Sequence, residues 1–376
     1  MDFTLSEEQE MLKNSARDFL RNECGKKLLR ELEKSESGFS RKLWDGMADL
    51  SWMGILVPES HGGVGLSFLE LGVLFEEFGR AALNGPMLGT AMGTLALLEG
   101  GSEGQEGALL AEVAAGKRIF AFALEEPGIS YDPRFVSLRA EGTDGGYCLS
   151  GTKLFVPYAA VADTLFVVAR TRGNPGDRDG VTLFRVAAGA AGLERTPLKT
   201  LAGDKQYQVE FRGVRVPARE VSGTPGGGLP LVLAILEKAT AVQCAEMVGG
   251  AQYELEVTAE YCRTRVQFNR PIGSFQAVQH RLADMFVDVQ GARLTTYQAL
   301  WRLSEGLPAA REVAIAKAFT SGAARRVAFS AQQLHAGMGY DLDHELHFYY
   351  RRAKTLELKL GSVPAQLTAL GGELRL

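Results

Sequence analysis

The sequence predicts an α+β fold in three consecutive parts, because the period of its hydrophobic pattern changes twice along the chain. Before about residue 118 and after about residue 222, apolar residues recur every three or four positions, as in amphipathic helices. Between these points they alternate with polar residues, as in half-buried strands. A chain of 376 residues is also longer than one typical domain. We therefore predict a helical domain over residues 1–117, an antiparallel β-domain over 118–222 and a helical bundle over 223–376.

The first part begins with a helix start. Ser6 and Gln9 have the spacing of a capping box, and the apolar positions of MLKNSARDFL follow at helical spacing. Two further helical patterns are LELGVLFEEFGRAAL and ALLAEVAAG. The glycine-rich segment SHGGVGLS lacks the Lys-Ser/Thr of a phosphate-binding P-loop and has no strand before it, so it predicts a turn.

The middle part reads as a small sheet. In YQVEFRGVRVP, Tyr207, Val209 and Phe211 face one way while the polar residues between them face the other. Further strand patterns are RIFAFALEEPG, VSLRAEGTDGGYCLSGTKLFV, DTLFVVART and GVTLFRVA. The tetrapeptide TDGG predicts a hairpin turn.

The last part consists of long helical patterns. They are LVLAILEKATAVQCAEMVGGAQYELEVTAEYCRTR, FQAVQHRLADMFVDVQGARLTTYQALW and REVAIAKAFTSGAARRVAFSAQQL. Helices of this length stack antiparallel into a bundle, and a second face of such a bundle commonly packs on another subunit.

Composition and charge favour a globular protein of the reduced cytoplasm. Hydrophobic residues make up 46% and charged residues 23% of the chain, which is ordinary for an enzyme. The formal net charge of -4 comes without a basic tract interleaved with aromatics, so we expect no nucleic-acid partner. We also expect no secretion signal and no membrane span, because no apolar run reaches about 18 residues. The cysteines form no CxxC pair and the histidines no HxH, HxxxH or HExxH pattern, so we expect no metal site.

Several stretches, taken together and in order, resemble the acyl-CoA dehydrogenase family. They are PESHGGVGLSFLELGVLFEEFGR, LEEPG, LSGTKLFV, RTRVQFNRPIGSFQAVQHRLADM and QQLHAGMGYDLDHELHFYYRRAK, and they cover essentially the whole chain. The resemblance implies a helical domain, a β-domain and a four-helix bundle. It also implies an FAD-dependent desaturation of an acyl-CoA thioester, a dimer or tetramer, and an electron-transfer flavoprotein or similar acceptor.

In the family, FAD spans a subunit interface and its adenosine end is held by the neighbouring chain's bundle. An Arg-x-x-Phe motif, a glutamine-bearing helix and a Gln-x-x-Gly-Gly loop provide the contacts. The planar fork of the arginine suits pyrophosphate, and the glycines allow the backbone to approach closely. Ala336 stands where the first glycine is usual, a small change that we expect to be tolerated. The resemblance carries these cofactor-binding roles to Arg265, Gln267, Phe268, Gln276, Gln333, Gly337 and Gly339.

The residues that would face the flavin ring depart from the family pattern. The family's Thr-Glu-Pro-Gly is Glu125-Glu126-Pro127-Gly128 here, so an acid replaces the hydroxyl, and Glu126 keeps the second place. In the following stretch Ile129–Asp132, Tyr131 stands where a compact serine contacts cofactor and thioester. The family's Trp-Ile-Thr becomes Phe155, Val156 and Pro157, and proline has no hydroxyl or N–H to donate to flavin N5. We therefore expect this chain's own flavin pocket to be impaired or empty.

The catalytic base is absent from both of its usual positions. In TLELKLGSVPAQ (355–366), Leu360 stands where the family has its glutamate before Gly-Thr. Some members carry the base on the preceding long helix, where Ala239 stands here. Glu357 and, less directly, Glu237 are the nearby acids that a different local backbone would have to bring in. Thr240 replaces an arginine common in the substrate channel.

The resemblance therefore points to a base-less subunit of a heteromeric acyl-CoA dehydrogenase, in an assembly of the kind that often handles bulky acyl-CoA such as sterol side chains. Losing a positioned base costs roughly 10²–10⁴-fold in rate. Three alternatives stay open. The chain could be a self-sufficient dehydrogenase with a relocated carboxylate, another flavin-dependent oxidase or monooxygenase, or a non-catalytic binding protein.

Overall fold

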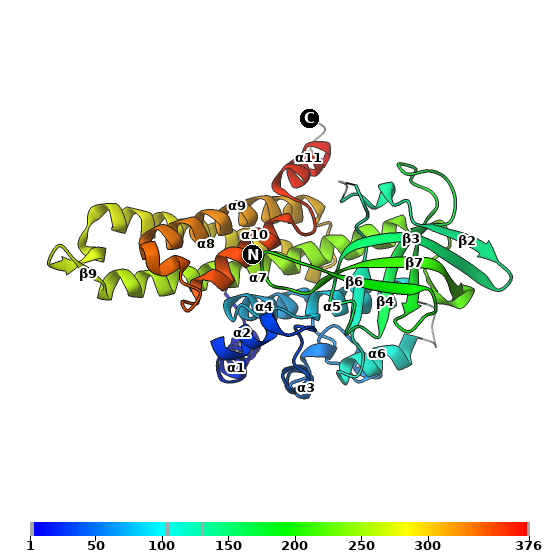
Figure 1. Cartoon of the computed structure of the whole chain (residues 1–376), viewed down its shortest axis with the longest axis horizontal. Helices are drawn as coiled ribbons and strands as arrows, with labels where there is room; N and C mark the ends of the chain where they lie inside the picture. Colours follow the sequence, from blue (N-terminus) through cyan, green and yellow to red (C-terminus); the bar gives the residue numbers. More distant parts are fainter. Residues whose placement is uncertain (1–3, 102–105, 129–130, 374–376) are drawn as a thin grey trace. The chain divides into compact units, whose positions relative to one another are not determined.

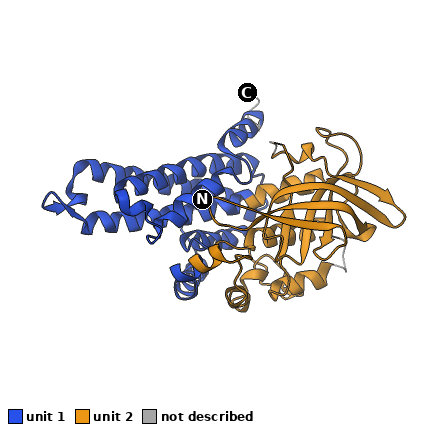
Figure 2. Ribbon diagram, in the orientation of Figure 1, with its two compact units in different colours: residues 1–29, 68–83, 240–376 blue, residues 30–67, 84–239 orange. Residues whose placement is uncertain are grey.

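A computed structural model describes residues 4–101, 106–128 and 131–373 (Figure 1). The chain folds into two compact units (Figure 2). Unit 1 comprises residues 1–29, 68–83 and 240–376, and unit 2 comprises residues 30–67 and 84–239. The chain passes between the units several times, whereas the three predicted domains are consecutive, so their boundaries stay a prediction.

Unit 2 is built on one sheet with the strand order β6-β7-β3-β2-β4-β5-β8. Most neighbours pair antiparallel, as predicted, but β1 pairs with β4 in parallel, and so does β2 at its first residue. The predicted TDGG turn is confirmed, because Thr143 pairs with Gly146 across Asp144 and Gly145. The strands are β1 (Phe120–Ala123), β2 (Arg139–Thr143), β3 (Gly146–Pro157), β4 (Thr164–Arg170), β5 (Val181–Ala187), β6 (Leu193–Leu198), β7 (Gln206–Pro217) and β8 (Val221–Ser222).

The helices of unit 2 include α3 (Arg41–Asp49), α5 (Met87–Gly100), α6 (Glu106–Ala114) and the start of α7 (Leu229–Thr264). Helix α5 lies against the sheet, since a Cβ at Gly93 would stand 2.4 Å from the ring of Phe120. Phe120 in turn packs edge-on against Phe166 of β4, with ring centroids 5.2 Å apart. The segment SHGGVGLS is a tight turn, as predicted, because a Cβ at Gly63 would stand 2.0 Å from the Val57 carbonyl oxygen.

Unit 1 is helical. The predicted capping box is confirmed at α1, where Ser6 and Gln9 exchange hydrogen bonds of 3.0 and 3.2 Å. The apolar faces of the long helices meet in a core that includes Leu255, Met285 and Val327. Among the described residues, no helix combines the length and apolarity needed to cross a membrane. The helices are α1 (Glu7–Glu23), α4 (Phe68–Arg80), α7 from Thr240 onward, α8 (Gln276–Ser304), α9 (Ala310–His335), α10 (Leu346–Leu358) and α11 (Val363–Glu373), and α2 (Lys26–Lys34) begins in this unit.

Helices α4 and α7 touch backbone to backbone. A Cβ at Gly79 would lie 1.8 Å from the Glu246 carbonyl oxygen, and one at Gly249 would lie 1.7 Å from the Glu76 carbonyl oxygen. No side chain fits between the two helices there, because the opposing atoms are backbone and cannot rotate away. Glycine at both positions therefore fixes how closely these helices approach.

We predict that Gly249→Ala lowers the free energy of unfolding by about 3 kcal/mol, because the added methyl group must push α7 away from α4. Gly250→Ala is the matched control, since a Cβ there would meet its nearest neighbour only at 3.7 Å. That variant should be neutral or more stable by up to about 1 kcal/mol, the helix preference of alanine over glycine. Urea denaturation of both variants checks the prediction, and equal stabilities would contradict it.

Candidate functional site

The predicted adenosine-binding residues of the Arg-x-x-Phe motif lie at one tip of unit 1. Arg265 follows the end of α7, and Gln267 belongs to a two-stranded hairpin formed by β9 (Val266–Gln267) and β10 (Arg270–Pro271). Gln276 is the first residue of α8. Arg265, Gln267 and Gln276 are all exposed. Three residues that the resemblance assigns to FAD binding therefore lie on exposed segments around the hairpin that joins α7 to α8.

The hairpin holds Phe268 away from its own chain. Phe268 and Asn269 both have positive φ, 51° and 61°, as in the tight turns that match the twist of a hairpin. The ring of Phe268 is 86% exposed and touches Phe275 edge-on at 6.0 Å. The Arg270 guanidinium lies 4.0 Å from the centroid of the Phe275 ring and closes the base of the loop. Such an exposed aromatic side chain on an ordered turn is suited to contact with another surface.

The second predicted group, Gln333, Gly337 and Gly339, lies at the same end of the bundle. Tyr261 of α7 stacks on His335 of α9 with ring centroids 4.4 Å apart, so the ends of these helices are neighbours. A Cβ at Gly337 would meet nothing within 4 Å, and Gln333 is exposed.

Ala336, which replaces the family's first glycine, has a φ of 51° and a ψ of -131°. Glycine adopts this conformation readily, whereas a residue with a Cβ is strained in it. The loop thus keeps the shape that glycine provides without the glycine. The expectation that alanine is tolerated stays a prediction.

Glu126, on the predicted flavin-ring face of unit 2, is engaged by its own chain. Its carboxylate accepts hydrogen bonds from the backbone N–H and the hydroxyl of Ser137, both at 2.6 Å, and from Leu138 N–H at 3.0 Å. The buried Lys153 ammonium donates to it at 2.7 Å and also to the Leu124 carbonyl. Burial alone would raise the pKa of Glu126, but the Lys153 charge and these hydrogen bonds outweigh it and lower the pKa. Glu126 therefore fastens the loop after β1 to β3.

Pro157 and Phe155, two of the other predicted ring-face residues, have no side-chain hydrogen-bond donor. Pro157 ends β3 opposite Gln206 and has no N–H. Phe155 sits at a bulge in the β3–β7 register with a φ of 52° and is half exposed. Burial, together with the charge of Glu125, raises the pKa of the half-buried Tyr131 phenol. Ile129 and Ser130 of the same stretch lie outside the described residues.

The primary position for the base is apolar but keeps a special backbone. Leu360 has a φ of 57° and Gly361 a φ of 98°, so the chain makes a left-handed turn directly after α10. The Gln366 side chain donates to the Leu360 carbonyl at 3.1 Å and holds this turn from α11. A leucine in this conformation costs about 1–2 kcal/mol relative to a helical one. The side chain at this left-handed turn is therefore a leucine and not an acid.

The substitute acids are already engaged. Glu357 is buried and its carboxylate lies 3.1 Å from Lys354 Nζ on the same helix. Ala239 and Thr240 are buried side by side in α7. Glu237 is half-buried and has interactions of its own. The role of Glu357 as a relocated base stays a prediction.

Lys317 of α9 is a residue that sequence reasoning missed. It is fully buried in unit 1, and its ammonium donates to Gln243 Oε1 at 2.7 Å and to the Leu356 carbonyl at the end of α10. Burial lowers its pKa to about 8. The signal was a lysine inside the apolar run AIAKAF, where a charged side chain needs a buried partner. Lys317 anchors the helix end that precedes Leu360.

The donors on the two faces decide where FAD fits. The bundle tip offers an exposed guanidinium, amide side chains and an uncovered glycine backbone, which suit pyrophosphate and adenosine. Among the described residues of the ring face, the Glu126 carboxylate is engaged by Lys153 and Pro157 has no N–H to donate, so these two positions do not supply a flavin donor. Among the described residues, His, Cys, Asp and Glu side chains form no group of three or more that could hold a metal ion.

Comparisons with known proteins cover the whole chain. Family patterns described as the N-terminal, middle and C-terminal domains of acyl-CoA dehydrogenase match residues 6–117, 121–214 and 226–372. Acyl-CoA dehydrogenase FadE27 of Mycobacterium tuberculosis is 38% identical, over 100% of this chain and 99% of the relative. A chain of the ChsE4-ChsE5 complex from the same organism matches with a TM-score of 0.91 and 35% identity, over 100% of this chain and 99% of that one. A chain of a Tcur3481-Tcur3483 steroid ACAD variant matches with a TM-score of 0.90 and 32% identity, over 99% of each.

We predict that Glu126→Gln lowers the free energy of unfolding at pH 7 by about 3 kcal/mol, because it leaves the buried Lys153 charge unpaired. The native pKa of Glu126 is lowered from 4.5, so the carboxylate contributes fully above about pH 4.5. Its contribution is lost as the pH falls through the native pKa. The stabilities of wild type and variant should therefore converge in acid.

Urea denaturation at pH 7 and at a series of acidic pH values checks this. Glu141→Gln, which changes an exposed carboxylate on β2, serves as the control and should have little effect. A gap between wild type and Glu126→Gln that persists unchanged in acid would contradict the assigned role.

Proposed function

We propose, from the premise that this chain belongs to the acyl-CoA dehydrogenase family, that it serves the α,β-desaturation of an acyl-CoA thioester as a subunit without the catalytic base. In this role its bundle completes the FAD site of a homologous partner chain, and the partner supplies the base. The observation that carries the proposal is the pair of apolar side chains, Leu360 and Ala239, at the two positions where the family resemblance places that base.

The bundle tip supports the first half of the proposal. Arg265 would pair with the pyrophosphate of FAD, and Phe268 would pack against its adenosine end. Both side chains are exposed at the junction of α7 and the hairpin. Gln333 and the uncovered backbone at Gly337 would line the same end. FAD, when bound, supplies the hydride acceptor of the reaction, and these residues hold and orient it.

The ring face of unit 2 supports the second half of the proposal, that the reaction takes place in the partner's site. A desaturase site needs donors around the flavin and an acid near the carbon that loses its proton. In this chain Glu126 is saturated by Lys153 and Ser137, and Pro157 has no donor to offer. A site that lacks both the donors and the base is not expected to turn over substrate by itself.

An exposed apolar surface on α8 and α9 supports assembly with another chain. We call it the α8/α9 face, and it consists of Phe286, Val287, Leu294 and Phe329. Each of these large apolar side chains is about half exposed or more, and its contact with water is unfavourable. A homologous subunit, in a dimer or tetramer, is the partner that we propose for this face.

The names of two similar structures support a heteromer. The ChsE4-ChsE5 complex and the Tcur3481-Tcur3483 steroid ACAD each carry two chain names. The second name also supports a bulky substrate, and we propose an acyl-CoA with a sterol side chain. The electron acceptor that we propose is an electron-transfer flavoprotein or a similar protein.

The proposal is tested by purifying the chain alone and together with a homologous chain encoded beside it. FAD per chain and bleaching of the flavin absorbance by a saturated acyl-CoA are then measured. We expect colour and bleaching only from the co-expressed pair. Bleaching of the lone chain would overturn the proposal in favour of a self-sufficient dehydrogenase, and colour that acyl-CoA never bleaches would favour another flavin reaction or a binding role.

In the co-expressed pair, we predict that Arg265→Ala weakens FAD binding by roughly tenfold to a hundredfold, because a charge-assisted hydrogen bond is worth about 1.5–3 kcal/mol. Arg263→Ala is the matched control, since Arg263 is equally exposed and pairs with Glu260 on its own helix. Equilibrium dialysis of FAD measures both variants. If both variants changed FAD affinity equally, or neither changed it, the proposed role of Arg265 in FAD binding would be wrong.

For the lone chain, we predict that Leu360→Glu does not create a dehydrogenase. The substitution restores an acid at the family position, but Pro157 and the engaged Glu126 still leave the ring face without donors. Acyl-CoA turnover with an artificial electron acceptor is the readout. Turnover by this variant without a partner would mean that the base was the sole missing part, contrary to the proposal.

A further inference from the structure

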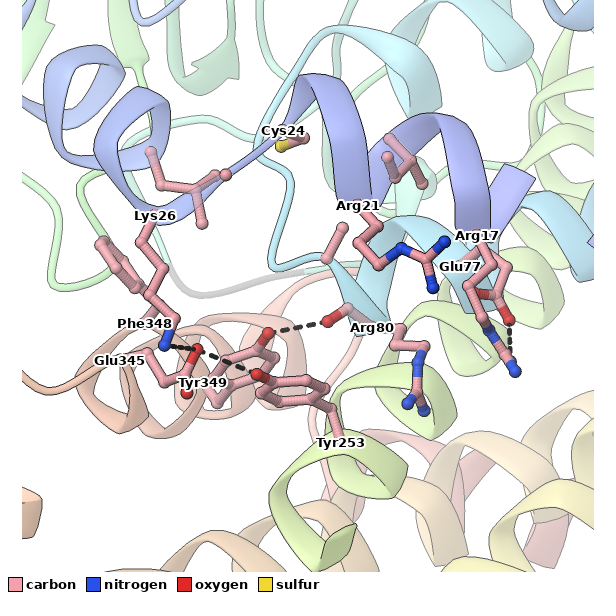
Figure 3. A pocket seen from close by; sticks show the side chains of 14 residues that line it. Arg17, Arg21, Cys24, Lys26, Glu77, Arg80, Tyr253, Glu345, Phe348 and Tyr349 are labelled. Atoms are coloured by element: carbon pink, nitrogen blue, oxygen red, sulfur yellow. Dashed lines mark hydrogen bonds and ion pairs between the residues drawn. The ribbon is translucent and has the colours of Figure 1, made fainter. Parts of the chain in front are cut away.

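Unit 1 contains a cavity of about 350 Å³ that the proposed function does not use. It lies between α1, the first turn of α2, α4, α7 and α10, and Figure 3 shows the side chains that line it. We propose that this cavity binds a small amphipathic anion, namely a carboxylate or phosphate joined to a short apolar chain or ring. The proposal is independent of the FAD site.

The inner wall of the cavity is apolar. Leu20, Cys24 and Phe348 are buried and line it together with the rings of Tyr253 and Tyr349. Burial raises the pKa of the Cys24 thiol to about 12, so it stays neutral and behaves as a small apolar group. These side chains offer a surface for a hydrocarbon tail.

Tyr253 and Tyr349 stack on each other in this wall, and the hydroxyl of each has a hydrogen-bond partner. Their rings are stacked with centroids 4.7 Å apart. The Tyr349 hydroxyl donates to the Arg80 carbonyl at 2.7 Å, and the Tyr253 hydroxyl donates to Glu345 at 2.9 Å. An entering ligand therefore meets the faces and edges of the rings rather than polar groups in need of a partner.

The mouth of the cavity is rich in basic side chains, which we call the cationic mouth. Arg17, Arg21, Lys26 and Arg80 line it together with the carboxylates of Glu77 and Glu345. Both carboxylates are neutralised within the cavity wall, by Arg17 at 2.6 Å and by Lys26 at 2.7 Å. Arg80 pairs with Glu256 outside the lining. The lining itself thus holds four basic and two acidic side chains, while acids just outside it pair with Arg80 and Arg21.

Arg21 is the cation best placed to exchange its partner for a ligand. Its ion pair is with Asp18 on its own helix, at 2.9 Å, and the two side chains are 71% and 63% exposed. An exposed pair of this kind contributes little and breaks readily. Figure 3 shows the Arg21 side chain extending from α1, and Arg21 lines the same cavity as Arg80 and the two tyrosines.

The size of the cavity limits the ligand. About 350 Å³ is near the lower end of the range for small-molecule sites. That volume suits a single short chain or ring and not a dinucleotide. An apolar interior with a cationic mouth selects the amphipathic anion over either a free alcohol or a free phosphate, since each of these matches only one half of the cavity.

The test is isothermal titration of the full chain with octanoate, octyl phosphate, 1-octanol and inorganic phosphate. We expect one molecule of octanoate or octyl phosphate to bind per chain, at least tenfold more tightly than octanol or phosphate, with an affinity that falls as salt is added. Octanoate binding tighter than octyl phosphate would assign a free carboxylate as ligand, and the reverse order a phosphate ester. Equal binding of octanol would overturn the role of the cationic mouth, and equal binding of phosphate the role of the apolar wall.

Two variants locate the site. Arg21→Glu reverses the exchangeable charge and should weaken octanoate binding at least tenfold. Gly25→Phe should abolish it, because Gly25 lines the cavity, a Cβ there meets nothing within 4 Å, and the attached ring would occupy space that the ligand needs. Arg41→Glu, which changes an exposed arginine paired with Asp45 in unit 2, is the control and should bind normally.

Circular dichroism confirms that each variant is folded, and FAD content of the co-expressed pair should be the same in all of them. Unchanged octanoate binding in both cavity variants would overturn the proposal. A loss of FAD without a loss of octanoate binding would instead concern the proposed function.

Discussion

The close crossing of α4 and α7 at Gly79 and Gly249 is the constraint on which unit 1 depends. Because the two backbones touch, the carboxylates of Glu76 and Glu77 are carried into the interior and must find partners there. Glu76 receives Arg293 and Tyr297, each at 2.9 Å, which ties α4 to α8. Glu77 receives Arg17 at 2.6 Å, which ties α4 to α1. The helix crossing and these ion pairs thus join α1, α4, α7 and α8 into one connected set of contacts.

The candidate site, as we propose it, combines the acyl-CoA dehydrogenase fold with only part of the family's chemical groups. On the sheet face, the buried pair of Lys153 and Glu126 secures the backbone, so the strand geometry persists without donors for a flavin. At the base position, Lys317 and Gln366 still hold the left-handed turn, although Leu360 has no acid to present. At the bundle tip, by contrast, the polar and aromatic side chains remain exposed. Contacts that hold the backbone are therefore present at positions where, in our proposal, the side chains needed for catalysis are absent.

The fold was predictable wherever local pattern decides structure. The capping box at Ser6 and the turn at Asp144 and Gly145 depend on neighbouring residues, and both are confirmed. The parallel pairing of β1 with β4 was missed, because partner and direction are set by contacts between distant segments. The interleaving of the two units was missed for the same reason. The period of the hydrophobic pattern predicts which face of a helix or strand is buried, but it does not predict which segment packs against that face.

The residues of the candidate site also differ in whether they could be predicted from local sequence. Motif letters place Arg265 and Phe268, and the structure puts them at one exposed tip. The same letters cannot reveal that Glu126 is saturated by Ser137 and Lys153, since those bonds need the folded loop. They also cannot show the strained backbone of Ala336, which a sequence records only as a small residue. A residue whose role depends on a contact with a sequence-distant residue cannot be assigned from a sequence motif alone.

The division of the chain into two interleaved units has a consequence for its biosynthesis. Residues 84–239 complete unit 2, whereas unit 1 needs residues 1–29 together with residues 240–376. Helices α1 and α4 therefore leave the ribosome long before α7 and α8 exist to cover them. During that interval the apolar face of α4 stays without its partners, which makes the incomplete chain prone to aggregation. A truncated nascent chain should consequently contain a finished sheet and an unfolded bundle.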